Sequence, residues 1–219
     1  QWNVFSLLGR DQPSGVDLIG NIDLRGKHGS AMGLNLDYDL PRMFGTMDSY
    51  LLPQDNGEER IGGRRDIEYD GEVRGYTRIQ HRQYISDVLE LSIESAYVSD
   101  ESFLEEFLPY EASESNTYQT SLYLKYQKKD HSFTFLTKYN VNDFLAQTTT
   151  LQTPGYFVDK LPEVGYYQIG KALLNNRLTY YTENHLSRAR IRAGKDIPAD
   201  RGFGTPASLI LFGIPSTTS

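Results

Sequence analysis

Four histidines are the residues of this sequence best suited to acid–base chemistry. His28 and His131 fall in short turns, where a solvated side chain is expected, whereas His81 and His185 fall on strand-like segments and could face a polar interior. A catalytic histidine needs a serine and an orienting Asp, Glu or Asn that converge from neighbouring elements. The sequence encodes no such convergence, and it holds no nucleophile motif, phosphate-binding loop or Cys/His metal spacing. We therefore expect no enzyme activity, no cofactor and no resident metal.

Two charged segments could bind ions. Hard divalent cations take carboxylate oxygens, and one segment is rich in them: Asp100, Glu101, Glu105, Glu106, Glu111 and Glu114. A solvated outer loop is the favoured interpretation of this segment. Arg60, Arg64 and Arg65 in another segment could bind phosphates in a bidentate manner, but the acids interspersed among them favour a plain charged loop.

Composition narrows the classes of protein that fit. The 219 residues carry a net charge of -7, which argues against nucleic-acid binding because phosphate contacts need clustered Lys and Arg. The absence of cysteine rules out a disulfide within these residues, and no run of about 18 apolar residues predicts a transmembrane helix. Sixteen Tyr and ten Phe favour strands over helices. The chain starts at Gln1 without a signal segment, so either a signal was removed or the chain is an internal fragment, and we favour the fragment.

The segments that must position any site alternate apolar and polar residues with a period of two, which is typical of a two-faced sheet. In residues 16–25 the apolar face holds Leu18, Gly20, Ile22 and Leu24, and the polar face holds Asp17, Asn21, Asp23 and Arg25. In residues 31–40 the apolar face holds Met32, Leu34, Leu36, Tyr38 and Leu40, and the polar face holds Ala31, Gly33, Asn35, Asp37 and Asp39. Residues 87–98 and 132–140 alternate in the same way, and residues 117–127 place Tyr118, Leu122, Leu124 and Tyr126 on their apolar face.

The lengths of the connections follow a rhythm. After a first turn at residues 26–30, short joints at 41–44, 83–86 and 128–131 alternate with long ones at 53–72, 99–116 and 141–160. Tight turns on one side and long loops on the other are typical of outer-membrane β-barrels. About nine strands are visible by this pattern, and strands near ten residues suit a tilted membrane crossing better than a globular sheet. Tyrosines near strand ends would form an interfacial girdle: Tyr38, Tyr97, Tyr126 and Tyr139.

Alternation alone leaves two architectures open. A soluble sandwich would bury the apolar faces against a second sheet, whereas a membrane barrel would turn them toward lipid and line a wet lumen with the polar faces. Strand length, the tyrosines and the loop rhythm favour an all-β, antiparallel transmembrane β-barrel. Open sheet edges are not tolerated in hydrocarbon, so the barrel would be partial in this chain, with closing strands missing.

Five stretches, in order and spacing, resemble the barrel domain of the lipopolysaccharide-assembly outer-membrane protein family LptD, also called OstA or organic solvent tolerance protein. They are DLIGNIDLRGKHGSAMGLNLDY (17–38), DSYLLPQD (48–55), RGYTRIQHR (74–82), YVSDESFLEEF (97–107) and LPEV (161–164). The fourth, similar to a "VSD" segment followed by spaced aromatic and acidic residues, is the most specific. The resemblance implies a barrel of about 26 strands, of which this chain would hold roughly the first third.

The resemblance also implies a domain plan, with residues 1–15 as a lead-in, 16–195 as barrel strands and 196–219 as an unassigned tail. The family's function implies a conduit for lipopolysaccharide into the outer leaflet of the outer membrane, with a plug lipoprotein (LptE) and a periplasmic bridge protein (LptA) as partners. The lumen would then be lined by Asn21, Asp23, Arg25, Asn35, Asp37 and Asp39. The strand at the lateral seam would present Leu18, Gly20, Ile22 and Leu24, where Gly20 weakens the strand locally.

Two alternatives remain open at this point. A porin-like or solute-specific channel would show basic or aromatic residues at a constriction. A soluble all-β carbohydrate-binding module would keep the apolar faces as a dry core.

Overall fold

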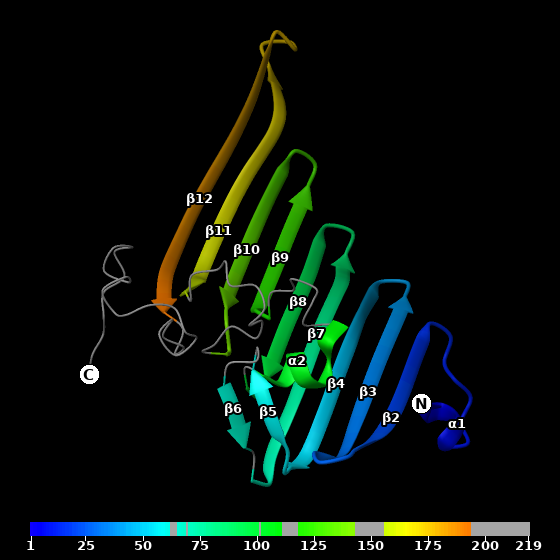
Figure 1. Ribbon diagram of the computed structural model, residues 1–219. Helices are drawn as coiled ribbons and strands as arrows, with labels where there is room; N and C mark the ends of the chain where they lie inside the picture. Colours follow the sequence, from blue (N-terminus) through cyan, green and yellow to red (C-terminus); the bar gives the residue numbers. More distant parts are fainter. Residues whose placement is uncertain (62–64, 69, 101, 111–117, 143–155, 194–219) are drawn as a thin grey trace, which may run out of the picture.

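The computed structural model describes residues 1–61, 65–68, 70–100, 102–110, 118–142 and 156–193, and these form one large sheet (Figure 1). Its strands are β1 (Trp2–Asn3), β2 (Val16–Arg25), β3 (Gly29–Leu40), β4 (Met43–Asp55), β7 (Glu72–Ser86), β8 (Leu89–Val98), β9 (Thr120–Lys128), β10 (His131–Tyr139), β11 (Tyr156–Leu173) and β12 (Leu178–Ala193). A separate hairpin pairs β5 (Glu58–Ile61) with β6 (Arg65–Glu68), and two short helices, α1 (Val4–Leu7) and α2 (Phe103–Phe107), complete the described elements.

Every pairing in the ten-stranded sheet is antiparallel, and the strands follow one another in chain order from β1 to β12. The sheet does not close on itself within the described residues, so β1 and β12 form its two edges. Figure 1 shows successive hairpins stepped along the strand direction, as the tilted, staggered strands of a barrel wall are. The predicted all-β, antiparallel partial barrel is therefore confirmed.

Tight connections gather at one end of the sheet. Two-residue turns join β3 to β4, β7 to β8 and β9 to β10, and a four-residue turn joins β11 to β12. Lys129 in the third turn and Leu174, Asn175 and Asn176 in the fourth have positive φ, the backbone twist that tight hairpin turns favour. We call this end the short-turn end, and the opposite end the long-loop end.

Two expected boundaries differ from the structure. The predicted joint at residues 83–86 belongs to β7, because the chain turns only at Asp87 and Val88. The predicted long joint at 53–72 begins later and is not without structure, since β4 runs to Asp55 and the β5–β6 hairpin follows. The first turn, after Arg25, is also short although it lies at the long-loop end, so the rhythm of loop lengths holds only from β4 onward.

The register places the predicted apolar and polar sets on opposite faces within the paired strands β2 to β10. Cross-strand partners share a face, and Leu34 pairs with Gly20 and Ser49, while Asn35 pairs with Ile19 and Asp48. The apolar face stays solvent-exposed in the described residues and includes Ile22, Met32, Leu51, Phe133 and Val164. An exposed apolar face of this extent is typical of a surface that meets lipid or a partner.

The four tyrosines predicted to form a girdle all lie on the apolar face. Tyr38 and Tyr126 lie near its short-turn end, and Tyr97 and Tyr139 lie near its long-loop end. Aromatic residues at both ends of an apolar band mark the two interfaces of a membrane barrel. Among the described residues, no helix is both long enough and apolar enough to cross a membrane.

The first prediction concerns which face meets lipid. Leu34→Arg, in the middle of β3 on the apolar face, is expected to lower the free energy of unfolding by about 2–4 kcal/mol, the cost of an arginine at the bilayer midplane. The matched control is Asn35→Arg on the opposite face, which keeps Asp48 as a neighbour. The measurement is a urea titration of the protein folded in phospholipid vesicles. Equal costs for the two substitutions would contradict a lipid-facing apolar face.

Candidate functional site

The six residues predicted to line a lumen share one face of the β2–β3 hairpin. Asp23 pairs with Ala31, and Asp37 pairs with Asp17 and Thr46, which places Asn21, Asp23, Arg25, Asn35, Asp37 and Asp39 together on the polar face. Asp17 and Asp37 lie directly opposite each other, a repulsive arrangement for two carboxylates.

Arginines on β7 offset part of this acidity. Asn35 donates a hydrogen bond to Asp48 at 2.8 Å, and Asp48 lies 3.6 Å from a guanidinium nitrogen of Arg78. Arg82 lies further along the same face, 3.3 Å from Glu90. The polar face is therefore a band of mixed charge, which suits a hydrated, hydrogen-bonding polymer better than an apolar one.

The histidines do not gather into a site. His185 lies on the polar face, 2.7 Å from Glu183 of the same strand, as predicted for a residue facing a polar interior. The same prediction is wrong for His81, which lies on the apolar face and hydrogen-bonds Tyr38. His28, predicted to be solvated, is instead mostly buried between Asp55 and Phe107. His131 hydrogen-bonds Tyr166 at 2.8 Å.

The predicted seam residues all lie on the apolar face of β2, next to the two-residue edge strand β1. Leu18 and Gly20 pair with Leu36 and Leu34 on the inner side, and Ile22 and Leu24 are 63% and 87% exposed. On the free side of β2, only Ile19 and Gly20 have a strand partner in the described residues, the two-residue β1. Val4 of α1 packs close to Gly20, where a Cβ would lie 3.5 Å from a methyl carbon of Val4. The half of β2 toward the long-loop end thus keeps an unpaired edge in the part of the chain that the structure describes.

A buried ionic cluster at the long-loop end was not foreseen from the sequence. Arg74 of β7 is 1% exposed and donates to Asp55 at 2.6 Å, to both oxygens of Asp100 at 2.9 and 2.7 Å, and to Ser102 at 2.9 Å. Asp55 also accepts a hydrogen bond from the backbone of Gly57, and its other neighbour is His28 at 2.8 Å. Bidentate pairing of arginine with carboxylate combines two charge-assisted hydrogen bonds, each roughly twice as strong as a neutral one, and adds geometric specificity.

This cluster fixes a segment across the polar face. We call residues 99–100 and 102–108 the cap segment; it contains α2, which lies over β4, β7 and β8 in Figure 1. Phe103, Leu104 and Phe107 are buried against a pocket formed by Ala31, Tyr50, Leu52, Tyr76, Ala96 and Val98. Each of these three side chains contributes about 1.5–3 kcal/mol by leaving water. The guanidinium of Arg74 also lies 5.6 Å from the ring centre of Phe103 and 5.3 Å from that of Phe107.

The solvated-loop interpretation of the acidic segment is wrong for Asp100, which is bound by Arg74, whereas Glu106 is 45% exposed and lies 3.7 Å from His28. Glu101, Glu111, Glu114 and the side chain of Glu105 fall outside the described part of the chain. The prediction that Tyr118 lies on the apolar face is also wrong. Tyr118 precedes β9, and its ring packs edge-on against Tyr76 in the buried cluster. One signal in the sequence could have revealed the cap: the polar face becomes apolar at Tyr50, Leu52, Tyr76, Ala96 and Val98.

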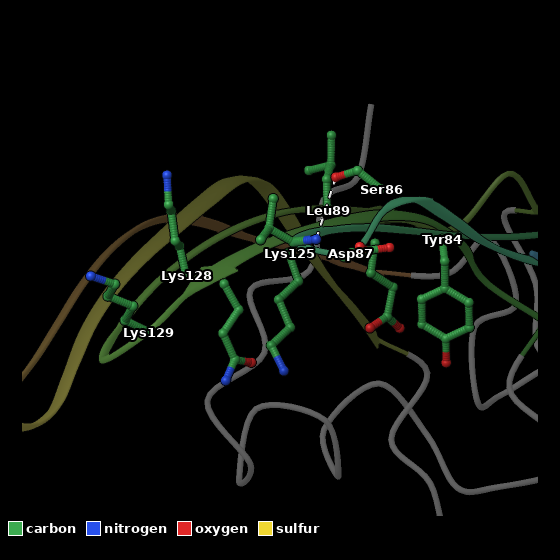
Figure 2. A pocket seen from close by; sticks show the side chains of 10 residues that line it. Tyr84, Ser86, Asp87, Leu89, Lys125, Lys128 and Lys129 are labelled. Carbon is green, nitrogen blue, oxygen red and sulfur yellow. Dashed lines mark hydrogen bonds between the residues drawn. The ribbon is translucent and has the colours of Figure 1, made fainter.

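At the short-turn end, an open hollow of about 380 Å³ lies between the β7–β8 and β9–β10 turns. Its lysines do not converge, since Lys125 lies on the polar face opposite Glu90, whereas Lys128 points to the other side of the sheet in Figure 2. We therefore assign no anion site to this hollow. The side chains of Arg60, Arg64 and Arg65 lie outside the described part of the chain.

The second prediction concerns pH. Burial raises the pKa of Asp100, but hydrogen bonds from Arg74, Ser99 and Ser102 outweigh burial and hold that pKa below its ordinary value. Asp100 therefore stabilises the docked cap above its ordinary pKa, and this stability is lost as pH falls through the lowered value. A solvatochromic dye on Glu106→Cys, in a chain without other cysteines, should report release of the cap in acid.

The control for this prediction is the same labelled protein carrying Asp100→Asn. Its cap should be looser at neutral pH, and it should lack the step in acid that belongs to Asp100, although the lowered pKa of Asp55 leaves a second carboxylate to titrate nearby. Identical pH profiles for the two proteins would contradict the assigned role of Asp100.

Comparison with known proteins places these features in a family. The model of the LptD family, LPS transport system D, matches residues 72–217, about two thirds of the chain, from β7 through β12 and beyond. A search of curated proteins gave no match. LptD proteins handle lipopolysaccharide transport and assembly and reside in the outer membrane, which agrees with a sheet that is apolar on one face and charged on the other. The chain therefore belongs to the LptD family of outer-membrane lipopolysaccharide transport proteins.

Proposed function

We propose that this chain forms part of the wall of a barrel conduit, with its polar face lining the lumen and its apolar face against lipid. The saccharide of lipopolysaccharide passes along the polar face, and the acyl chains leave sideways through a seam at β2. The observation that carries the proposal is the segregation of charge onto one face over most of the sheet, from Asp17 on β2 to His185 on β12. The exceptions are Lys128 at the end of β9 and the Asp159–Arg190 pair beyond the bulge of β11. No chemical step is required, and the conduit acts by partitioning its cargo between a wet and an apolar surface.

The edge of β2 supports the location of the seam. Its outer half, from Asn21 to Arg25, has no strand partner on its free side among the described residues, and only Ile19 and Gly20 pair with β1. In hydrocarbon an unpaired edge costs several kcal/mol per group, so a further strand must cover it in the assembled barrel. A seam between such strands can open with the loss of few backbone hydrogen bonds. Through an open seam, the acyl chains reach the membrane without crossing water.

The domain plan and partners belong to the same proposal. Residues 1–15 lead into the barrel, 16–195 supply barrel strands and 196–219 remain unassigned. A plug lipoprotein (LptE) and a periplasmic bridge protein (LptA) are the partners that family membership supports. A soluble carbohydrate-binding module is disfavoured because its core would require a cover for the apolar face, and the described residues leave that face exposed.

The third prediction maps the route of the cargo by photo-crosslinking in the complete protein. A crosslinking residue at Asn35 should capture lipopolysaccharide, because it faces the lumen, and its neighbour at Leu36 should not, because it faces phospholipid in the inner half of the membrane. At the seam, Ile22 should capture lipopolysaccharide, whereas Leu122, at a similar height on the apolar face of β9, should not. Adducts are read by immunoblotting with an antibody against lipopolysaccharide.

Each pair of positions decides one point. Capture at Leu36 but not at Asn35 would reverse the assignment of the faces. Equal capture at Ile22 and Leu122 would remove the evidence for a seam at β2. A porin-like channel, the alternative, predicts no lipopolysaccharide adduct at Asn35 and conductance of small solutes through the unsubstituted protein.

A further inference from the structure

We propose that the lipid-facing surface at the outer end of β12 carries a site for the phosphorylated sugar headgroup of a lipopolysaccharide that already lies in the outer leaflet. The inference rests on the proposed function, since it requires the apolar face to meet lipid and the long-loop end to lie outside. β12 lies far across the described sheet from β2 (Figure 1). The lipid bound here is therefore a resident neighbour of the wall and is distinct from cargo in the seam.

Arginines interrupt the apolar face where β12 approaches the long-loop end. The pairs Ser187–Glu163 and Ala189–Lys160 lie on the polar face, so the residues that alternate with them project outward. From the membrane interior toward the outside, these outward residues are Leu186, Arg188, Arg190 and Arg192. The side chain of Arg190 is 67% exposed. Because a cation on a lipid-facing surface is costly except near the interface, this row of arginines is expected to lie at the level of the headgroups.

A β-bulge in β11 turns one carboxylate toward these arginines. Between Lys160 and Glu163, three residue steps of β11 lie opposite two steps of β10 and two of β12. Without the extra residue, alternation would place Asp159 on the polar face; with it, Asp159 pairs with Arg190 on the apolar face. Bulges commonly re-aim a side chain next to a functional site. A specific feature of the backbone therefore puts this ion pair on the outer surface.

Asp159 holds two of the arginines in place and keeps one acceptor in reserve. It is 1% exposed, and its Oδ2 lies 3.1 Å from Arg190 and 3.5 Å from Arg192. Arg192 also donates to the carbonyl of Asn140 at 2.7 Å and lies 5.2 Å from the ring centre of Phe157. The other oxygen of Asp159, Oδ1, is buried and accepts no hydrogen bond from the described residues. A buried acceptor without a donor is unfavourable, and a sugar hydroxyl would supply the donor.

The ionic group borders an open hollow of about 400 Å³ on the outer surface. Its lining residues come from β10, β11 and β12 and the residue after β10: Tyr139, Asn140, Asp159, Leu161, Arg190 and Arg192. On this part of the apolar face, Asp159 is the one carboxylate among the described residues and faces three arginines, so positive charge is in excess. Alternate residues of a strand are about 7 Å apart, so Arg188 and Arg190 can contact separate oxygens of one headgroup.

Two kinds of contact favour a glycolipid as the occupant. Guanidinium groups recognise phosphate oxygens in a bidentate manner, whereas the reserve oxygen of Asp159 requires a donor such as a sugar hydroxyl. A phosphorylated sugar carries both groups, and lipopolysaccharide is the lipid that the family handles. Further toward the membrane interior, Leu186 and Val164 pair on the apolar face and are 77% and 42% exposed, which provides a surface for acyl chains. This footprint covers β11 and β12 and does not extend to Leu122 on β9.

The fourth prediction tests the site by photo-crosslinking from Leu186, the apolar neighbour of the arginines. The complete protein carries the crosslinking residue at this position and is reconstituted into phosphatidylcholine vesicles that contain bisphosphorylated lipid A. Mass spectrometry then gives the ratio of lipid A adducts to phosphatidylcholine adducts. Combining Arg188→Gln with Arg190→Gln is expected to lower that ratio by about fivefold or more, because both exposed guanidiniums are lost. An unchanged ratio would overturn the site.

The matched control combines Lys138→Gln with Lys160→Gln. These two lysines pair with each other on the polar face at the same height, so the control removes the same charge from the opposite side of the wall. It should keep the original ratio, and an equal fall would show that net charge alone governs the lipid. Continued capture of phosphatidylcholine by the arginine variant shows that this variant is folded in the membrane.

A further measurement needs no substitution among the arginines. Dephosphorylated lipid A, offered to the protein with both arginines intact, should give a ratio as low as that of the arginine variant. Millimolar inorganic phosphate should leave the capture of bisphosphorylated lipid A unchanged. Equal capture of the dephosphorylated lipid would remove the role of phosphate, and displacement by inorganic phosphate would show a site for free phosphate in place of a lipid site. Either result would overturn the inference.

The failure of this inference is distinguishable from the failure of the proposed function. Capture of any lipid at Leu186 tests only that the apolar face meets the membrane, and capture of lipopolysaccharide at Asn35 tests only the lumen. If both captures occur and the arginine variant keeps its ratio, the conduit stands and the headgroup site is wrong. If Leu186 captures no lipid of either kind, the assignment of the faces is itself wrong.

Discussion

Backbone hydrogen bonding in a medium without water is the constraint on which this structure depends. In hydrocarbon each unpaired N–H or C=O costs several kcal/mol, so strands can cross a membrane only as neighbours in a continuous ladder. The nine long strands from β2 to β12 satisfy this requirement by pairing antiparallel with their neighbours in chain order. Once the ladder is fixed, the period of two assigns every side chain to one face, and a slip of one residue would invert that assignment.

The same constraint makes the edge of β2 the place where the wall is weakest. An interior strand is held on both sides, whereas β2 is held by β3 on one side and, among the described residues, only by the two pairs with β1 on the other. The exposed Ile22 and Leu24 stand on this edge. A seam requires a strand that can separate from one neighbour at a low cost in free energy. That cost is lowest where the fewest residues are paired by backbone hydrogen bonds.

The cap segment packs apolar side chains against a face of the sheet that is otherwise polar. Burial of Arg74 is costly in isolation, because a desolvated charge is stable only when it is paired and hydrogen-bonded. Here Asp55, Asp100 and Ser102 occupy its donors, and the rings of Phe103 and Phe107 pack around it. The geometry therefore binds β4, β7 and the cap to one another, and the contacts of Phe107 extend the connection to the first hairpin.

The sequence by itself determined the all-β class, the two faces of the strands and the grouping of the six polar residues from Asn21 to Asp39, because a period of two is a local property of the chain. It also supported the family, since the order and spacing of short motifs are readable without a fold. Only the tertiary structure decided the environments of Asp100, His28 and Tyr118, which are buried or ion-paired rather than solvated or lipid-facing. Their environments depend on Arg74, Phe107 and Tyr76, which are distant in sequence and meet them only when the cap folds over the sheet. Strand ends such as Ser86 were likewise set by pairing across strands, an interaction that no single stretch of sequence contains.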